Sequence, residues 1–133
     1  MKIERNRIIK KENGASAVEF ALILPILIML VFGIFQFGIA YNNYIALTHA
    51  AREGARLAAV TVITDENIAW FENRVQESAP SVTIESITLS GQDGDIGYPV
   101  TVTVTGEVLN IEIPLVGSWP IQLTSTATLR IEQ

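Results

Sequence analysis

The chain has 133 residues, enough for one domain and a membrane anchor, and it contains no cysteine. The missing cysteine excludes a disulfide scaffold, a thiol nucleophile and cysteine-based metal sites. Five of the nine Lys and Arg residues fall in the first eleven positions, whereas the chain from Ala15 onward carries four basic and twelve acidic residues. This acidic body argues against nucleic acid as a partner, because phosphate binding needs clustered Lys and Arg.

A basic leader, residues 1–14, precedes a long apolar segment. From Phe20 to Phe35 every residue is apolar, Gly or Pro. Residues 15–40 contain three polar residues, namely Ser16, Glu19 and Gln36. At about 1.5 Å rise per residue, this segment exceeds the roughly 30 Å hydrocarbon core of a bilayer. We therefore predict a transmembrane helix over residues 15–40.

The distribution of charge sets the orientation of this helix. The basic leader is expected to stay in the cytoplasm, so the residues after Ala40 lie outside. Tyr41 and Tyr44 then fall where an interfacial aromatic belt belongs, and Pro25 should kink the helix. The string Gly38-Ile39-Ala40 resembles a secretory cleavage site, but the apolar run is longer than the roughly 7–15 residues of a signal-peptide core. An uncleaved anchor is therefore favoured over cleavage after Ala40.

Glu19 is unusual because it lies at the start of the apolar run, where an unpaired charge costs about 2.5–3.5 kcal/mol on insertion scales. One interpretation places it at the membrane edge, in reach of water or headgroups. The other begins with a peptidase that cuts after Gly14, where the missing side chain leaves the backbone open to attack. The new amine of Ala15 could then pair with Glu19 within an assembly, so that two costly charges compensate each other.

These residues carry a resemblance. A basic leader ending in Gly14, Glu19 as the fifth residue after it and an unbroken apolar helix resemble a type IV pilin or pseudopilin. The string GASAVEFALILPILIMLVFGIFQFGIAYNNYIALTHAAREGARLAAV, residues 14–60, is similar to the TadE-like family, and LTSTATLRIE, residues 123–132, also fits it. Members of this family are minor pilin-like components of the tight adherence (Flp) pilus machinery. Whether the chain is closer to the TadE or the TadG type stays open.

The resemblance implies processing by an aspartic prepilin peptidase after Gly14, with Ala15, Glu19 and Phe20 as the recognition and assembly segment. Major Flp pilins are shorter and often have Tyr where this chain has Phe20, which favours a minor component. The implied partners are the prepilin peptidase, other pilins, pilus assembly proteins and the lipid bilayer. The implied location is the cytoplasmic membrane in a single pass, with the N-terminus inside, the C-terminal domain outside and a surface pilus as a further possible destination.

A second helical segment, residues 41–62, is predicted to continue outside the membrane, because residues 44–60 are rich in good helix formers. One polar stripe consists of His49, Arg52, Glu53 and Arg56. Small residues recur at every fourth position, at Ala46, Ala50, Gly54 and Ala58, which predicts close packing. The partner of this small face stays open between the chain's own β-sheet and a helix of another subunit. A lone His beside Glu53 is a poor metal site, so a surface contact is expected there.

Residues 63–133 are predicted to form a small β-rich extracytoplasmic domain, so the fold class is α+β and pilin-like. A short helix is expected over residues 65–78, capped by Thr64 or Asp65 and stopped by Pro80. Its predicted apolar face consists of Ile68, Phe71 and Val75, with Trp70 helping. Antiparallel strands are expected over 82–89 (with a bulge), 100–105, 107–113 and 121–132.

The segment Gly91–Gly97 is interpreted as a turn, because Asp-Gly is common in hairpins. Asp93 and Asp95 offer a weak alternative, a calcium site, although the further ligands of an EF-hand loop are missing. No other cofactor and no catalytic constellation is predicted. The leading hypothesis is a structural pilin-like subunit, not an enzyme. The alternatives are a membrane-tethered extracytoplasmic binding module outside any pilus and, more remotely, a carboxylate enzyme.

Overall fold

The computed structural model describes the backbone of residues 4–132 and the side chains of residues 14–132. A 57-residue helix, α1 (Glu4–Val60), is followed by a short helix, α2 (Ile68–Glu77), and five strands. The strands are β1 (Ile84–Ser90), β2 (Pro99–Gly106), β3 (Leu109–Ile113), β4 (Gly117–Ile121) and β5 (Thr124–Arg130). The predicted α+β class is thus confirmed. The basic side chains of the predicted leader lie outside the described residues.

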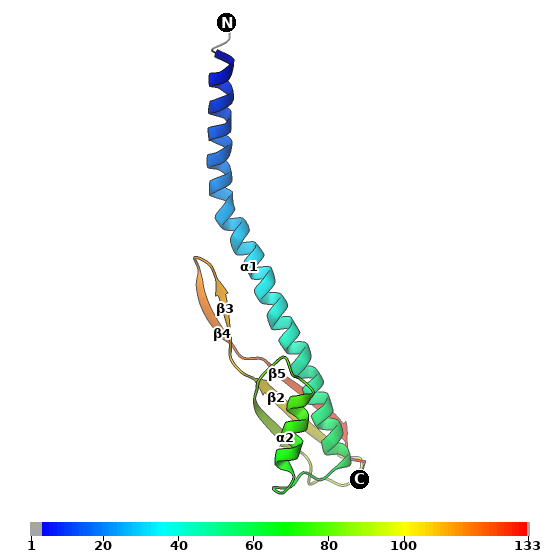
Figure 1. The fold of residues 1–133 in the computed structure, drawn as a ribbon. Helices are drawn as coiled ribbons and strands as arrows, with labels where there is room; N and C mark the ends of the chain where they lie inside the picture. The colour runs from blue at the N-terminus through cyan, green and yellow to red at the C-terminus, as the bar shows by residue number, and fades with distance from the viewer. Residues whose placement is uncertain (1–3, 133) are drawn as a thin grey trace.

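Helix α1 extends far beyond the rest of the fold, as Figure 1 shows. The predicted membrane segment and its extracytoplasmic continuation form one uninterrupted helix. Pro25 lies inside it, and α1 changes direction in the light-blue part of Figure 1. A proline removes one backbone hydrogen bond and crowds the preceding turn, which explains a bend there.

A three-stranded antiparallel sheet, in the order β1-β2-β5, packs on the C-terminal half of α1. Successive side chains of a strand point to opposite faces, and β2 shows this period plainly. Val100, Val102 and Val104 are fully buried toward the core, while the threonines between them face outward. The predicted bulge in β1 is confirmed, since its pairing with β2 shifts between Ile84 and Ser86.

The core lies where α1, α2 and this sheet meet. Helix α1 contributes mostly small side chains, which let its backbone approach the valines of β2 closely. The buried apolar residues are Leu47, Ala50, Ala51, Ala55, Ala58, Ala59, Phe71, Val75, Ala79, Val82, Val100, Val102, Val104 and Ile131. Ser125, the one polar residue buried with them among the described residues, shares a 3.1 Å hydrogen bond with Thr48 of α1. The C-terminal end of the chain is tied to α1 by the Glu132 N–H, which donates to the Ala59 carbonyl at 2.9 Å.

The short helix begins later than predicted, at Ile68, and Asn67 takes the cap position instead of Thr64 or Asp65. The reason is a turn held by the Asn67 side chain, which accepts from the Thr64 N–H (2.8 Å) and donates to the Val62 carbonyl (2.9 Å).

The predicted apolar face of the short helix is also narrower than expected. Phe71 and Val75 are buried one turn apart, whereas Ile68 is 38% and Trp70 49% exposed. A ten-residue helix lying on the core buries only the stripe that points inward, and Trp70 lies off that stripe.

The predicted last strand, residues 121–132, is wrong as a single element. Strand β4 ends at Ile121 and pairs with β3 in a separate two-stranded hairpin, whereas β5 starts at Thr124 and pairs with β2. The chain changes sheet at Gln122 and Leu123, where the Leu123 carbonyl accepts from the Gly106 N–H at 2.9 Å. Alternation of apolar and polar residues continues through this corner, which is why the pattern reads as one strand.

Candidate functional site

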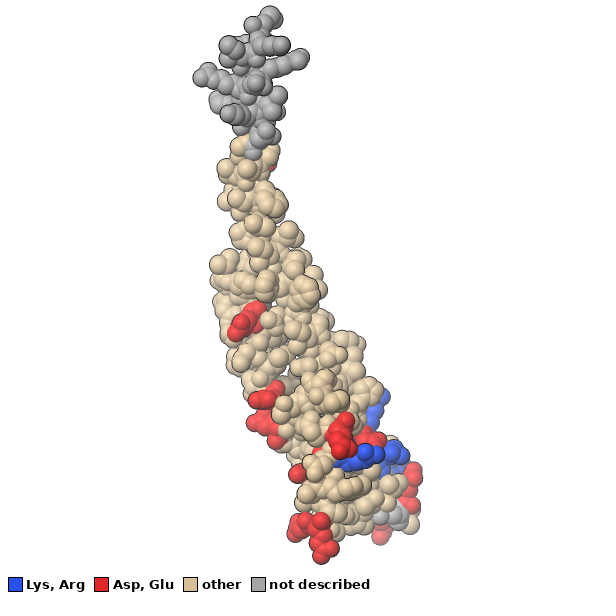
Figure 2. Space-filling model, in the orientation of Figure 1, with Lys and Arg blue, Asp and Glu red and all other residues tan. Residues whose placement is uncertain are grey.

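Residues 15–40 of α1, the predicted membrane segment, are apolar apart from Ser16, Glu19 and Gln36, and no side chain among them is buried; we call this segment the apolar shaft. It is long and apolar enough to cross a membrane, and its most apolar stretch has no buried residue. Figure 2 shows this shaft as an almost entirely tan surface. Large side chains such as Phe20, Leu22, Phe35 and Phe37 are 61–72% exposed. A continuous apolar surface of this extent is expected only where lipid or another protein covers it, so the apolar shaft fits a single-pass membrane anchor.

The predicted cleavage and recognition residues lie at the far end of this shaft. Gly14, Ala15, Glu19 and Phe20 are all exposed and lie within the helix, so no turn or loop separates Gly14 from the anchor. No atom lies within 4 Å of the position that a Cβ of Gly14 would take. Among residues 14–132, no ion pair reaches Glu19. The segment is therefore open to an external partner.

The small-residue face further along α1 packs on the chain's own domain. Ala50, Gly54 and Ala58 are buried, and Ala46 is half-buried at the edge of the core. A Cβ on Gly54 would lie 3.0 Å from Cγ1 of Val102, which is tighter than ordinary packing allows. Of the two partners considered for this face, the structure places the sheet and α2 against it.

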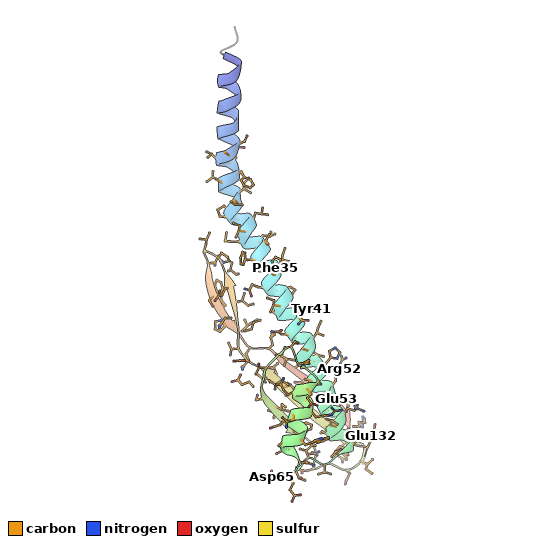
Figure 3. The ribbon with its side chains drawn as sticks, viewed as in Figure 1. Phe35, Tyr41, Arg52, Glu53, Asp65 and Glu132 are labelled. Atoms are coloured by element: carbon orange, nitrogen blue, oxygen red, sulfur yellow. The ribbon has the colours of Figure 1, made fainter. Side chains whose placement is uncertain are left out.

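The predicted polar stripe lies on the solvent side of α1, and Figure 3 shows Arg52 and Glu53 on it. The Arg56 guanidinium donates two 3.2 Å hydrogen bonds to the Glu53 carboxylate. This interaction lowers the pKa of Glu53 below its ordinary value of 4.5, against a smaller raising effect of burial. His49 lines a shallow hollow with Glu53, Arg74, Glu77 and Ser78. Among the described residues, no group of three or more His, Asp and Glu could hold a metal ion.

The predicted turn at Gly91–Gly97 connects β1 to β2 at the end of the domain away from the anchor. Gly91 and Gly97 have φ angles of +83° and +89°, in the left-handed region that favours glycine. Gln92 fixes the loop to the end of α1, since its amide donates to the Thr61 carbonyl at 2.8 Å. Asp93 and Asp95 lie in the exposed part of this loop, and calcium binding there stays a prediction.

The outer face of the sheet carries nine hydroxyl groups in three cross-strand rows. The rows are Ser86-Thr105-Thr124, Thr88-Thr103-Thr126 and Ser90-Thr101-Thr128. Within them, Thr101 and Thr128 share a 2.9 Å hydrogen bond and Thr103 and Thr126 a 3.1 Å one. The sequence indicates alternating threonines, but the grid depends on strand register and order, which only the structure gives.

The sequence predicts a strand over residues 107–113, found as β3, but not its pairing with β4 in a separate hairpin. This hairpin leaves the main sheet and runs back alongside α1 toward the N-terminal end (Figure 1). A gap between the hairpin and the helix is lined by Phe32 and Gln36 of α1 and by residues 112–118 of the hairpin. The hairpin therefore reaches the level of the apolar shaft, although its sequence position suggests only another strand of the soluble domain.

Comparison with known proteins adds one finding. No curated protein and no solved structure matches this chain. A family model described as TadE-like protein matches residues 14–56. The match begins at the predicted cleavage position, runs through the apolar shaft and ends in the polar stripe on the domain-bound part of α1. Residues 14–56 are therefore similar to the TadE-like family, in agreement with the resemblance that their motifs indicated.

Proposed function

We propose that this protein is a minor pilin-like component, a pseudopilin, that takes part in assembly of a tight adherence type IV pilus. The observation that carries the proposal is the division of one TadE-like helix into two parts. Residues 15–40 are almost entirely apolar and none of them is buried, whereas the part from Leu47 to Ala59 is built into the core of a folded domain. Such a molecule holds its domain outside the membrane and keeps a helix free to pack with others.

The free half of α1 suits two environments in turn. Lipid solvates an all-apolar helix, and other helices can replace lipid, because neither exposes the apolar surface to water. The proposal therefore assigns the helix first to the cytoplasmic membrane, with the N-terminus inside, and afterwards to contacts with other pilins or assembly proteins. No catalytic role and no nucleic-acid partner is proposed.

Processing by a prepilin peptidase would hydrolyse the peptide bond between Gly14 and Ala15. This bond lies inside α1, so the helix must open locally before the backbone can enter an active site. Gly14 assists this step because glycine disfavours an α-helix by about 1 kcal/mol relative to alanine. Cutting leaves a positively charged amine at Ala15, four residues from Glu19 on the same side of the helix. In an assembly, the carboxylate of one copy can pair with the amine of a neighbour, which offsets the cost of both charges in the apolar layer.

The experiment compares Gly14→Leu with Gly33→Leu in the natural host. Neither glycine has an atom within 4 Å of its Cβ position, so neither change disturbs the fold of the domain. We expect the mass of the membrane-extracted protein to show an intact leader in Gly14→Leu and a removed leader in Gly33→Leu. A removed leader in both variants would contradict the assigned cleavage point.

A second variant separates assembly from tethering. Glu19→Gln should still be processed but should reduce piliation in the same way as deletion of the gene. If the protein were only a tethered binding module, piliation would be unaffected, and a soluble fragment from about Asn42 would keep its ligand binding.

A further inference from the structure

The turn at the tip of the β3–β4 hairpin consists of apolar residues, which is unusual for a turn that faces water. Between the paired residues Ile113 and Gly117 lie Pro114, Leu115 and Val116. Leu115 is 84% and Val116 56% exposed. Leu115 also has a φ of +69°, a conformation that is uncommon outside glycine, asparagine and aspartate. Turns that face water usually place Gly, Asn or Asp at such a position, so this tip is matched to an apolar environment.

The tip lies beside the apolar shaft of α1. Phe32 and Gln36 line one gap together with residues 112–118. About 20 helical residues, or 30 Å, are needed to cross the hydrocarbon core. The residues from Ser16 to Phe35 supply that length, which puts Gln36 at the outer boundary of the core. Phe32, one turn earlier, then lies about 6 Å inside it.

Polar and aromatic residues of the hairpin mark the same boundary. Glu112 is the only charged residue between Val108 and Ile121, and it lines the gap with Gln36. Trp119 pairs with Ile111 on the side of Glu112 away from the tip and is 47% exposed. Tryptophan favours the headgroup region, where its ring meets apolar chains and its N–H meets polar groups. Toward the tip, the exposed side chains are apolar.

We propose that the β3–β4 hairpin is a second membrane contact, whose tip, Pro114–Val116, enters the extracytoplasmic leaflet beside α1. With Glu112 and Gln36 at the headgroup boundary, two to three strand residues carry the tip roughly 7–10 Å deeper, a depth typical of elements that lie in a membrane interface. Two contacts fix the rotation and tilt of the domain on the membrane, where a single helix would leave it free to swing. This inference requires α1 to span a bilayer, but it does not depend on cleavage after Gly14.

The absence of cysteine from the chain allows a direct test with single nitroxide labels on the full-length protein. Leu115→Cys reports on the tip. Leu30→Cys, at a residue of the shaft that is 58% exposed and about 9 Å inside the boundary at Gln36, is the control in lipid. Asp93→Cys, in the loop away from the anchor, is the control in water. The labelled chains are placed in vesicles of phosphatidylethanolamine and phosphatidylglycerol. Collision of each label with a water-soluble nickel chelate and with oxygen is then measured by electron paramagnetic resonance.

We expect the nickel collision rate at position 115 to be several-fold lower than at position 93 and close to that at position 30, with oxygen collisions showing the reverse order. The same result should appear at one copy per vesicle and at high density, and at Val116→Cys if Leu115→Cys perturbs the turn. Nickel access at position 115 equal to that at position 93 would overturn the proposal. Protection that appears only at high density would also overturn it, because the tip would then be covered by a second copy of the chain. An uncleaved leader would refute the processing scheme without changing these readings.

Discussion

Replacing Gly54 with leucine should destabilise the domain, because α1 and the sheet approach most closely at this residue. A Cβ there would lie 3.0 Å from Cγ1 of Val102 and 3.2 Å from Cγ2 of Val75. Valine side chains are stiff at χ1 and cannot turn away cheaply. Overpacking of this kind typically costs about 1–3 kcal/mol, while removal of a helical glycine returns at most about 1 kcal/mol. The net loss is at most about 2 kcal/mol, which should lower Tm by on the order of 10 °C for a domain of this size.

Scanning calorimetry of the full chain in detergent micelles measures this change. Gly38→Leu is the matched control, because it adds the same side chain to the same helix at a position with no atom within 4 Å. Gly54→Ala should fall between the wild type and Gly54→Leu. Equal Tm values for Gly54→Leu and Gly38→Leu would refute the close packing of α1 on its own sheet. If the domain stayed stable but assembly failed, the small face would instead belong to an interface between subunits.

Three further predictions concern the domain. Phe71→Ala should lose about 3–5 kcal/mol of unfolding free energy in urea titrations, because it leaves a cavity in the core, whereas Trp70→Ala next to it should change stability little. Glu53→Gln should be slightly less stable than the wild type above about pH 5, because the pKa of Glu53 is lowered in the folded state. The difference in unfolding free energy should disappear as the pH falls through that pKa, which urea titrations near pH 7 and pH 3 would show. Gly91→Ala should destabilise the loop, since its φ of +83° strains any L side chain and a Cβ would meet the backbone oxygen of the opposite strand; an unchanged Tm would contradict the observed turn.

The sequence predicts α1 well because its signals are long and one-sided. An uninterrupted apolar run indicates the anchor, and small residues at every fourth position indicate a closely packed face, although not which partner it meets. The alternation Val-Thr in β2 predicts both faces of that strand, and the phase shift in β1 predicts its bulge. These features depend only on the spacing of apolar and polar residues along one helix or strand, and this spacing can be read directly from the sequence.

The remaining features depend on contacts between distant segments. Helix α2 begins later than predicted because the Asn67 side chain forms hydrogen bonds with the backbone of Val62 and Thr64 and holds this segment in a turn. Residues 121–132 are predicted as one strand because Ile121 and Leu123 continue the apolar–polar alternation of β5, although the chain changes sheet between them and β5. Strand β4 is difficult to predict from the sequence because it contains Gly117 and Pro120, and neither residue type is typical of a strand. The position of the β3–β4 hairpin beside α1 cannot be predicted until β3 and β4 are known to pair with each other and not with the main sheet.

The proposed function requires that α1 is a pilin-like helix whose basic leader is removed. N-terminal sequencing of the protein extracted from its native membrane, together with its intact mass, tests this requirement. We expect a chain that begins at Ala15, retains the apolar helix and continues to the end of the domain. A chain that still begins at Met1, or one that begins after Ala40, would contradict it.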